Sequence, residues 1–199
     1  MNQIEEVISK VSEIMTSQNF IGIGSTRKVY RYKNLVVKKN LHKIGHLQSI
    51  KEQEMFRDLN LKGMTQYLAP VLHTDEKLSI QPFYEPLPLK NGETYNIELE
   101  TDDRSTNELR EVIEEIDKKY DGFDLLDSGN YGLDQDGKLI LIDYGMTKKL
   151  YENEWAPLAT AGILPQIYFE SCQVCGREKE LRIYGENDSD RRCLECGKE

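Results

Sequence analysis

Four cysteines, all within the last thirty residues, place the tightest constraint on how this chain of 199 residues can fold. They form two pairs, Cys172-x-x-Cys175 and Cys193-x-x-Cys196, each followed by a glycine and separated from the other by seventeen residues. Two Cys-x-x-Cys pairs at this separation are typical of one Zn²⁺ ion bound by four thiolates. Because four protein ligands leave no open position, we predict a structural zinc ribbon of two hairpins over residues 169–199. Redox or disulfide chemistry of the same cysteines is the competing interpretation.

The charge balance limits the partners of the chain. The formal net charge is -9 and the sequence pI is near 5.0, so the surface repels nucleic-acid phosphates unless bases cluster locally. No apolar run reaches the ~20 residues that a membrane-spanning helix needs, and acidic residues occupy the N-terminus where a secretory signal carries bases. We therefore expect a cytoplasmic protein with no membrane contact.

Hydrophobic periodicity predicts a mixed α+β chain. In chain order we expect a helix over residues 2–17, three antiparallel strands over 20–41, a helix over 47–61, strands over 69–74 and 77–83, a helix over 105–120, and a hairpin over 130–145. The proline-bearing segment 82–88 and the polar segment 91–104 separate the two halves. Ser105 is the predicted N-cap of the third helix, and Gly137 the residue with positive φ in the hairpin turn.

Several residues with possible phosphate chemistry follow one another along the first half. The segment Gly22-Ile-Gly24-Ser-Thr-Arg27-Lys-Val29 is a glycine-rich strand turn, whose backbone N–H groups can approach phosphates closely. Lys38 ends the run Leu-Val-Val-Lys on the next strand, and alternation places it on the opposite face from Lys39. On the following helix Glu52 lies on the same face as the apolar Met55 and Phe56, so its carboxylate can point inward toward Lys38. Glu54 is the alternative partner of Lys38.

The second half carries the strongest of these motifs. Asn130 and the tripeptide Asp143-Tyr-Gly145 flank the predicted hairpin, so that an amide and a carboxylate stand at its two ends. Oxygen ligands of this kind suit Mg²⁺.

The order of these motifs resembles the protein-kinase fold over roughly residues 20–150. The resemblance implies a compact two-lobed protein-kinase-like fold, with an N-terminal helix (1–19), an N-lobe (20–85), a truncated C-lobe (86–168) and the zinc ribbon (169–199). The C-lobe is short because only residues 146–170 lie between the Asp-Tyr-Gly motif and the cysteines, with no Ala-Pro-Glu motif. Such brevity resembles the small atypical kinase-like proteins of bacteria and their phages, so a viral protein of this kind would act in the host cytoplasm.

The resemblance also implies roles for the motif residues. Three residues of the glycine turn, Gly22, Gly24 and Val29, would cover ATP, while Lys38 would bind its phosphates and Glu52 would hold Lys38. Asn130 and Asp143 would be the Mg²⁺ ligands. Arg27 departs from the pattern because it stands where the family has its third glycine.

The catalytic base is a second departure. The His-Arg-Asp signature is absent, and the position of the family's catalytic aspartate is occupied here by Leu125. Asp124 is the first candidate for the base, and Asp127 the second.

Two functions follow from the resemblance. The first is an ATP- and Mg²⁺-dependent phosphotransferase acting on protein hydroxyls. The alternative is a pseudokinase-type binding protein that recruits or inhibits a protein partner through its lobes and its ribbon. Transfer to a small molecule is a third reading, since related folds phosphorylate sugars and antibiotics.

The ribbon has its own candidate partners. Arg182, Arg191 and Arg192 are the residues through which it would contact nucleic acid, but acidic neighbours dilute this charge. We expect instead a protein partner or simple bracing of the lower lobe, with Trp155 and residues 159–167 packing the ribbon against the rest of the chain.

Overall fold

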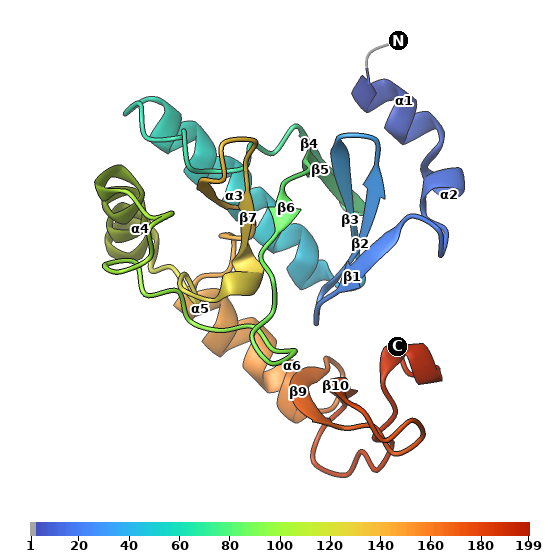
Figure 1. Ribbon diagram of the computed structural model, residues 1–199. Helices are drawn as coiled ribbons and strands as arrows, with labels where there is room; N and C mark the ends of the chain where they lie inside the picture. The colour runs from blue at the N-terminus through green and yellow to red at the C-terminus, as the bar shows by residue number, and fades with distance from the viewer. Residues whose placement is uncertain (1–2) are drawn as a thin grey trace.

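The computed structural model describes residues 3–199 and confirms a mixed α+β fold with antiparallel sheets and a cysteine cluster (Figure 1). Its larger sheet has five strands in the order β1-β2-β3-β5-β4, all antiparallel to their neighbours. These strands are β1 (Phe20–Ile23), β2 (Arg27–Tyr32), β3 (Leu35–Asn40), β4 (His73–Thr74) and β5 (Leu78–Pro82). All five lie within the strand segments predicted from the sequence.

Two short helices, α1 (Gln3–Ser9) and α2 (Val11–Ile14), cover one face of this sheet. The single helix predicted over residues 2–17 is therefore wrong, because the chain bends at Lys10, where φ is -110° and ψ is 18°. Its predicted first residue, Asn2, lies outside the described residues. With the bend, Val7 and Ile14 are both buried against the strands.

Helix α3 (Lys43–Asn60) packs on the other face of the sheet. It begins four residues earlier than predicted, because the His42 side chain accepts a hydrogen bond from the Ile44 N–H and caps the helix. Ser49 of α3 donates a hydrogen bond to Ser79 of β5 over 3.1 Å. This helix therefore contributes side chains to the face of the sheet that carries Lys38.

The second half of the chain forms a second core together with Met55 and Leu59 of α3. Helix α4 (Asn107–Tyr120) packs beside a three-stranded antiparallel sheet made of β6 (Glu85–Pro86), β7 (Tyr131–Leu133) and β8 (Leu139–Leu141). The N-cap of α4 is Thr106, one residue after the predicted Ser105, and its hydroxyl accepts from the Leu109 N–H. Gly137 has a φ of 78°, as predicted for the hairpin turn.

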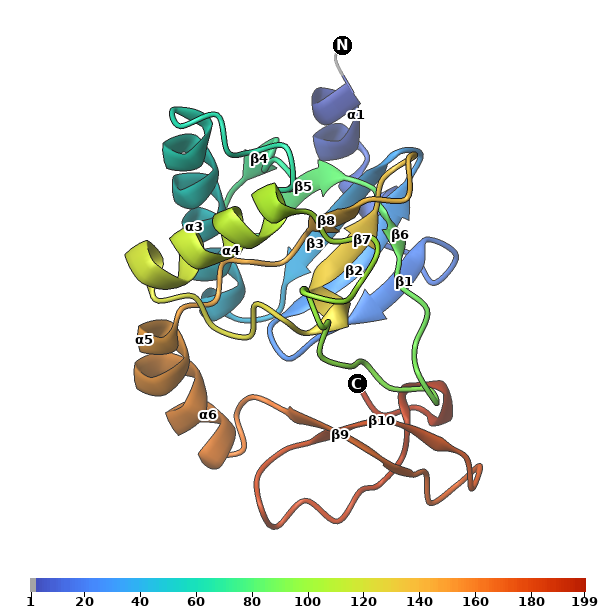
Figure 2. The same cartoon turned by 60° about the vertical axis from the view of Figure 1, so that its left-hand side comes forward.

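A bent helical segment leads from this core to the cysteines (Figure 2). It consists of α5 (Lys148–Leu150), a π-helical turn (Tyr151–Trp155) and α6 (Ala156–Thr160). The hairpin of β9 (Gln166–Ser171) and β10 (Glu178–Ile183) follows, and it lies below the free edge of β1. Within residues 3–199, no helix combines the length and apolar character needed to cross a membrane.

Candidate functional site

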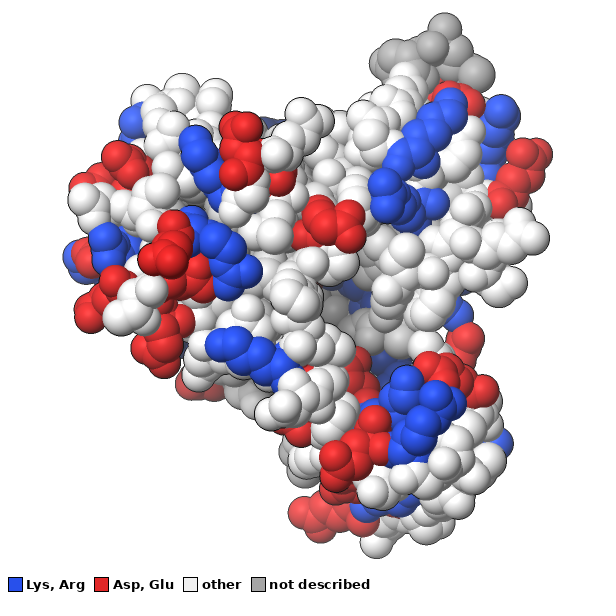
Figure 3. All heavy atoms as spheres, viewed as in Figure 1, with Lys and Arg blue, Asp and Glu red and all other residues white. Residues whose placement is uncertain are grey.

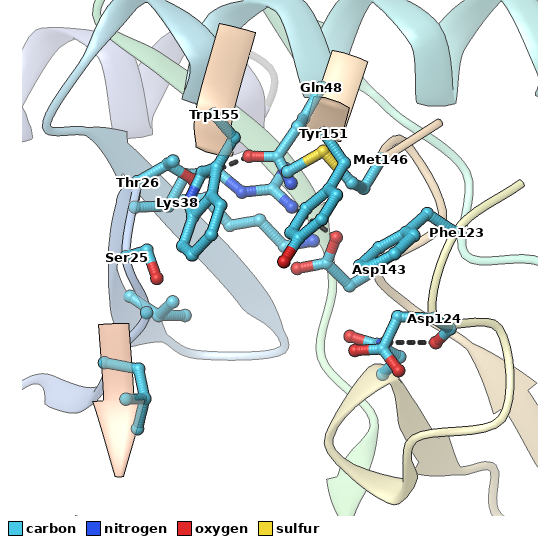
Figure 4. Close-up of a pocket in the computed structure, with 15 residues that line it drawn as sticks. Ser25, Thr26, Lys38, Gln48, Phe123, Asp124, Asp143, Met146, Tyr151 and Trp155 are labelled. Atoms are coloured by element: carbon cyan, nitrogen blue, oxygen red, sulfur yellow. Dashed lines mark hydrogen bonds and ion pairs between the residues drawn. The ribbon is translucent and has the colours of Figure 1, made fainter. Parts of the chain in front are cut away.

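Two adjoining cavities form a cleft where the two halves of the chain meet. Their volumes are about 330 and 380 Å³, and they share the residues Val29, Lys38 and Asp143. Polar groups from the glycine turn and from residues 123–130 line the first cavity (Figure 4). The second lies between β3, β5 and the segment 82–86, and its walls are more apolar, with Ile21, Val36, Phe83 and Ile142 among them. A charged half thus adjoins an apolar half.

Lys38 and Glu52 meet at the junction of the two cavities. Lys38 is 5% exposed, its Nζ lies 3.8 Å from Glu52 Oε1, and it donates a hydrogen bond to the Ile142 carbonyl over 2.7 Å. Burial lowers the pKa of Lys38 and raises the pKa of Glu52. The rival Glu54 pairs instead with Lys51, on the exposed side of α3. The structure therefore brings Lys38 to Glu52 and not to Glu54.

Arg27, which departs from the glycine pattern, is the most deeply placed cation of the site. It is 4% exposed, and its Nη1 lies 3.1 Å from Glu52 Oε1 and 3.3 Å from Ser49 Oγ, while Nη2 binds Asp143 Oδ1. Burial alone would lower the pKa of Arg27, but the carboxylates of Asp143 and Glu52 raise it. The pKa of Asp143 is lowered, against the effect of burial, by Arg27 and Lys38. The sequence interpretation missed this residue as a site residue.

The Asp143-Tyr144-Gly145 turn is held by packing on both sides. The buried Tyr144 donates a hydrogen bond from its hydroxyl to the Ala69 carbonyl over 2.8 Å. A Cβ added to Gly145 would stand 2.0 Å from the Gln48 carbonyl oxygen of α3. Glycine at this position thus allows α3, and with it Glu52, to approach Asp143.

The two candidate bases differ in their surroundings. The Asp127 carboxylate caps the short helical turn Ser128–Asn130, accepting from Gly129 N–H over 2.6 Å and from the Thr94 hydroxyl over 3.1 Å. Asp124 instead lines the first cavity, and its backbone has a left-handed φ of 59°. Partial burial raises the pKa of Asp124, and the nearby carboxylates of Asp127 and Asp143 raise it further.

Asn130 lies between these residues and Asp143. Its side-chain amide donates to the Asp124 carbonyl over 2.8 Å, which fixes the left-handed turn, and it lines the first cavity together with Asp143. The glycine turn contributes Gly24 to the same cavity, whereas Gly22 lines a neighbouring hollow between β1 and the ribbon.

A row of three aromatic rings borders the first cavity and was not anticipated as part of the site (Figure 4). Phe123 and Tyr151 stack with ring centroids 4.0 Å apart, and Tyr151 and Trp155 stack at 5.0 Å, each pair within 15° of parallel. Trp155, predicted to pack the ribbon, therefore lies in the wall of the cleft.

The donor set fits Mg²⁺ poorly. One Asp143 oxygen is already bound to a guanidinium, and the second expected ligand, Asn130, is held by its hydrogen bond to the Asp124 carbonyl. Within the described part of the chain, the only group of three or more Cys, His, Asp and Glu residues placed to bind a metal ion is that of the four cysteines. The negative charge of Asp143, which a divalent cation would neutralise, is thus already paired with Arg27.

The four cysteine sulfurs fit a metal ion such as Zn²⁺. They lie within 4.8 Å of one another, and Cys172 Sγ accepts hydrogen bonds from the backbone N–H groups of Val174 and Cys193 over 3.5 and 3.3 Å. The two glycines that follow the pairs, Gly176 and Gly197, have φ values of 67° and 97°. This positive φ is the conformation expected of both knuckles.

The ribbon has one hairpin and not the two predicted. Cys172 and Cys175 lie in the turn between β9 and β10, but the second pair lies on an irregular loop that ends in a short helical turn (Leu194–Cys196). A single bridge between Leu181 and Cys193 joins this loop to β10. Ion pairs of Lys179 with Glu195 and of Arg191 with Glu170 also connect the loop to the hairpin.

The arginines of the ribbon do not form a basic surface. Arg191 pairs with Glu170 and Arg192 with Asp190, and basic and acidic side chains are interspersed on the face of the ribbon that Figure 3 shows. Arg182 is buried against the glycine turn. A continuous phosphate-binding patch is not formed by these three residues.

No protein-family model matches the chain, and no curated protein matches it either.

Proposed function

We propose that this chain is a nucleotide-binding protein of protein-kinase-like design, which binds ATP across the two cavities of the cleft. The observation that carries this proposal is the position of Lys38, a buried cation at the junction of an apolar and a charged cavity. An adenine ring suits the apolar half, and the phosphates suit the half that holds Lys38 and the glycine turn.

The surroundings of Lys38 support this role. Glu52 is fully buried 3.8 Å from its ammonium group, and Gln81 donates to the other Glu52 oxygen over 3.3 Å, so both charged groups have fixed positions. The ammonium group is thus oriented before a ligand arrives, which reduces the entropy lost on binding.

Neighbouring lysines provide a matched test. We expect Lys38→Met to weaken ATP binding by about tenfold or more, because it removes a desolvated phosphate partner. Lys39→Met, at an exposed position of β3 on the opposite face from Lys38, should change binding by less than about twofold. Titration calorimetry with ATP measures both, and circular dichroism verifies folding. Failure of the folded wild-type protein to bind ATP would contradict the proposal.

A second candidate function is phosphate transfer to a protein hydroxyl, and the position of Asp124 in the same cavity favours it. Asp124 would accept the hydroxyl proton while that oxygen bonds to the γ-phosphorus and the bond to the β-phosphate oxygen breaks, releasing ADP. If the protein binds ATP but transfers no phosphate, its function is that of the pseudokinase-type binding protein. The protein partner and the cytoplasmic location stay predictions from the sequence.

A further inference from the structure

Four charged side chains form a balanced cluster at the base of the cleft. The cations are Arg27 and Lys38, and the anions are Glu52 and Asp143, so the formal charges cancel. With a glycine in place of Arg27, as in the family that the sequence resembles, one negative charge would be left over. A divalent cation bound with the nucleotide would then offset that charge.

The space for Arg27 is built into helix α3. A Cβ added to Gly45 would stand 2.9 Å from Arg27 Cγ and 2.7 Å from the Thr26 carbonyl oxygen. The Thr26 hydroxyl donates to Gln48 Oε1 over 2.6 Å, which joins the start of β2 to the same helix. The Arg27 side chain thus lies in a buried channel along α3, where packing fixes its position.

The Asp143 carboxylate keeps one oxygen that is not bound to Arg27. Its side chain is 34% exposed, while Oδ1 is bound to Arg27. A divalent cation on the remaining oxygen would stand close to a guanidinium that has little access to screening water, and this repulsion opposes its binding. The Lys38 ammonium group, which lines both cavities, instead attracts an anionic triphosphate.

We infer that Arg27 takes the place of the divalent cation, so that the cleft binds the nucleoside triphosphate without Mg²⁺. This inference rests on the proposed nucleotide binding and specifies its metal requirement. Arg27 neutralises Asp143, and Lys38, which lines both cavities, contacts the phosphates.

Titration calorimetry with ATP, in EDTA and in excess Mg²⁺, tests this inference on the full chain. For the wild type we expect affinities in the two conditions to agree within about threefold, or to favour EDTA. Arg27→Gln restores the unbalanced carboxylate and should bind ATP about tenfold more weakly in EDTA than in Mg²⁺. Arg27→Lys keeps the positive charge but loses the simultaneous contacts of two nitrogens with Glu52 and Asp143, so its affinities in the two conditions should differ less than those of Arg27→Gln.

The wild-type measurement decides the inference even if Arg27→Gln does not fold. Binding of ATP by the wild type in Mg²⁺ but not in EDTA would overturn the inference and leave the proposed function standing. Absence of binding in both conditions would contradict the proposed function, and the inference with it. A third result, equal binding in both conditions by wild type and a folded Arg27→Gln, would show that Arg27 does not set the metal requirement.

Discussion

The guanidinium of Arg182 in the ribbon donates a hydrogen bond from Nη1 to the Gly24 carbonyl oxygen in the glycine turn, over 2.5 Å. Arg182 is 5% exposed, and a second link, between Glu199 and Lys28, joins the end of the chain to β2 over 2.6 Å. The ribbon thus contacts the edge of the five-stranded sheet, and not only the lower half that the sequence suggested. Its position fixes one wall of the cleft.

Loss of the Arg182 contact should loosen the glycine turn. We expect Arg182→Met, which keeps the apolar part of the side chain, to speed amide hydrogen exchange in residues 22–27 by about tenfold, since a buried hydrogen bond to a charged donor is lost. Arg177→Met is the control, because Arg177 pairs with Glu195 on the exposed side of the ribbon. Equal exchange in the two variants would show that the contact does not brace the turn.

Metal removal should unfold the ribbon. Its buried cluster consists of Leu181, Ile183 and two of the cysteines, Cys172 and Cys193, which is too small a core to fold without a cross-link. We expect the purified protein to contain about one zinc per chain. Cys193→Ser should lose the metal and lower the melting temperature, as measured by metal analysis and calorimetry. Full zinc content in the Cys193→Ser variant would contradict the four-cysteine site.

Helix α3 depends on the absence of a side chain at Gly145. Gly145→Ala places a Cβ against the Gln48 carbonyl, so we expect a loss of about 1–3 kcal/mol in the free energy of unfolding, measured with urea. Gly22→Ala is the matched control, because a Cβ there would meet no atom within 4 Å. Similar stability of the two variants would refute the close approach of α3 to this turn.

Substitutions of the two aspartates next to the cleft should have different effects in a phosphate-transfer assay. Asp124→Asn should abolish transfer of the γ-phosphate and leave ATP affinity within about twofold, because its carboxylate faces the cavity without a cap role. Asp127→Ala removes the cap of Ser128–Asn130 and should cost stability, by about 1 kcal/mol, with transfer retained. Transfer by Asp124→Asn at the wild-type rate would exclude Asp124 as the base.

The contact of α1 with the sheet should depend on pH. Glu6 accepts hydrogen bonds from the Tyr32 hydroxyl over 2.8 Å and from Lys33, and these partners lower the pKa of Glu6 to about 2. A lowered folded-state pKa gives stability that is present above 4.5, the ordinary pKa of a glutamate, and lost as the pH falls toward 2.

Urea midpoints of wild type and Glu6→Gln, measured between pH 7 and pH 2, check this expectation. The difference between them should be constant above about pH 5 and shrink toward pH 2. Glu13→Gln on α2, which also removes one exposed carboxylate, serves as the control. A Glu6→Gln difference that does not change with pH would mean that the charge of Glu6 is not what holds α1.

Local patterns were enough to predict most strands and helices of the fold. Alternation and turn residues indicate β1, β2 and β3, and the positive φ of Gly137 follows from its turn position. The start of α3 was missed because His42 is an unusual N-cap residue, and the start of α4 was misplaced by one residue because Ser105 and Thr106 are both suitable caps. Capping is decided by one hydrogen bond, which a periodic pattern does not report.

The site was predictable only in part, because its main contacts join distant segments. Lys38 and Glu52 follow from neighbouring elements, but Arg27 meets Asp143 across 116 residues of sequence. The sequence indicated only that Arg27 replaces the third glycine of the family pattern, because the role of an arginine depends on which carboxylates surround it in the fold. The one available signal was strand alternation: Arg27 pairs with Asn40, two residues from Lys38, so the two cations lie on the same face of the paired strands.

The stack of Phe123, Tyr151 and Trp155 has a practical consequence. Trp155 is the single tryptophan of the chain, and it lies in the wall of the first cavity. Its emission therefore reports on this one place in the molecule, without labels or engineered probes. Any ligand that enters the charged half of the cleft changes the water around the indole, so binding there is visible in the intrinsic fluorescence of the unmodified protein.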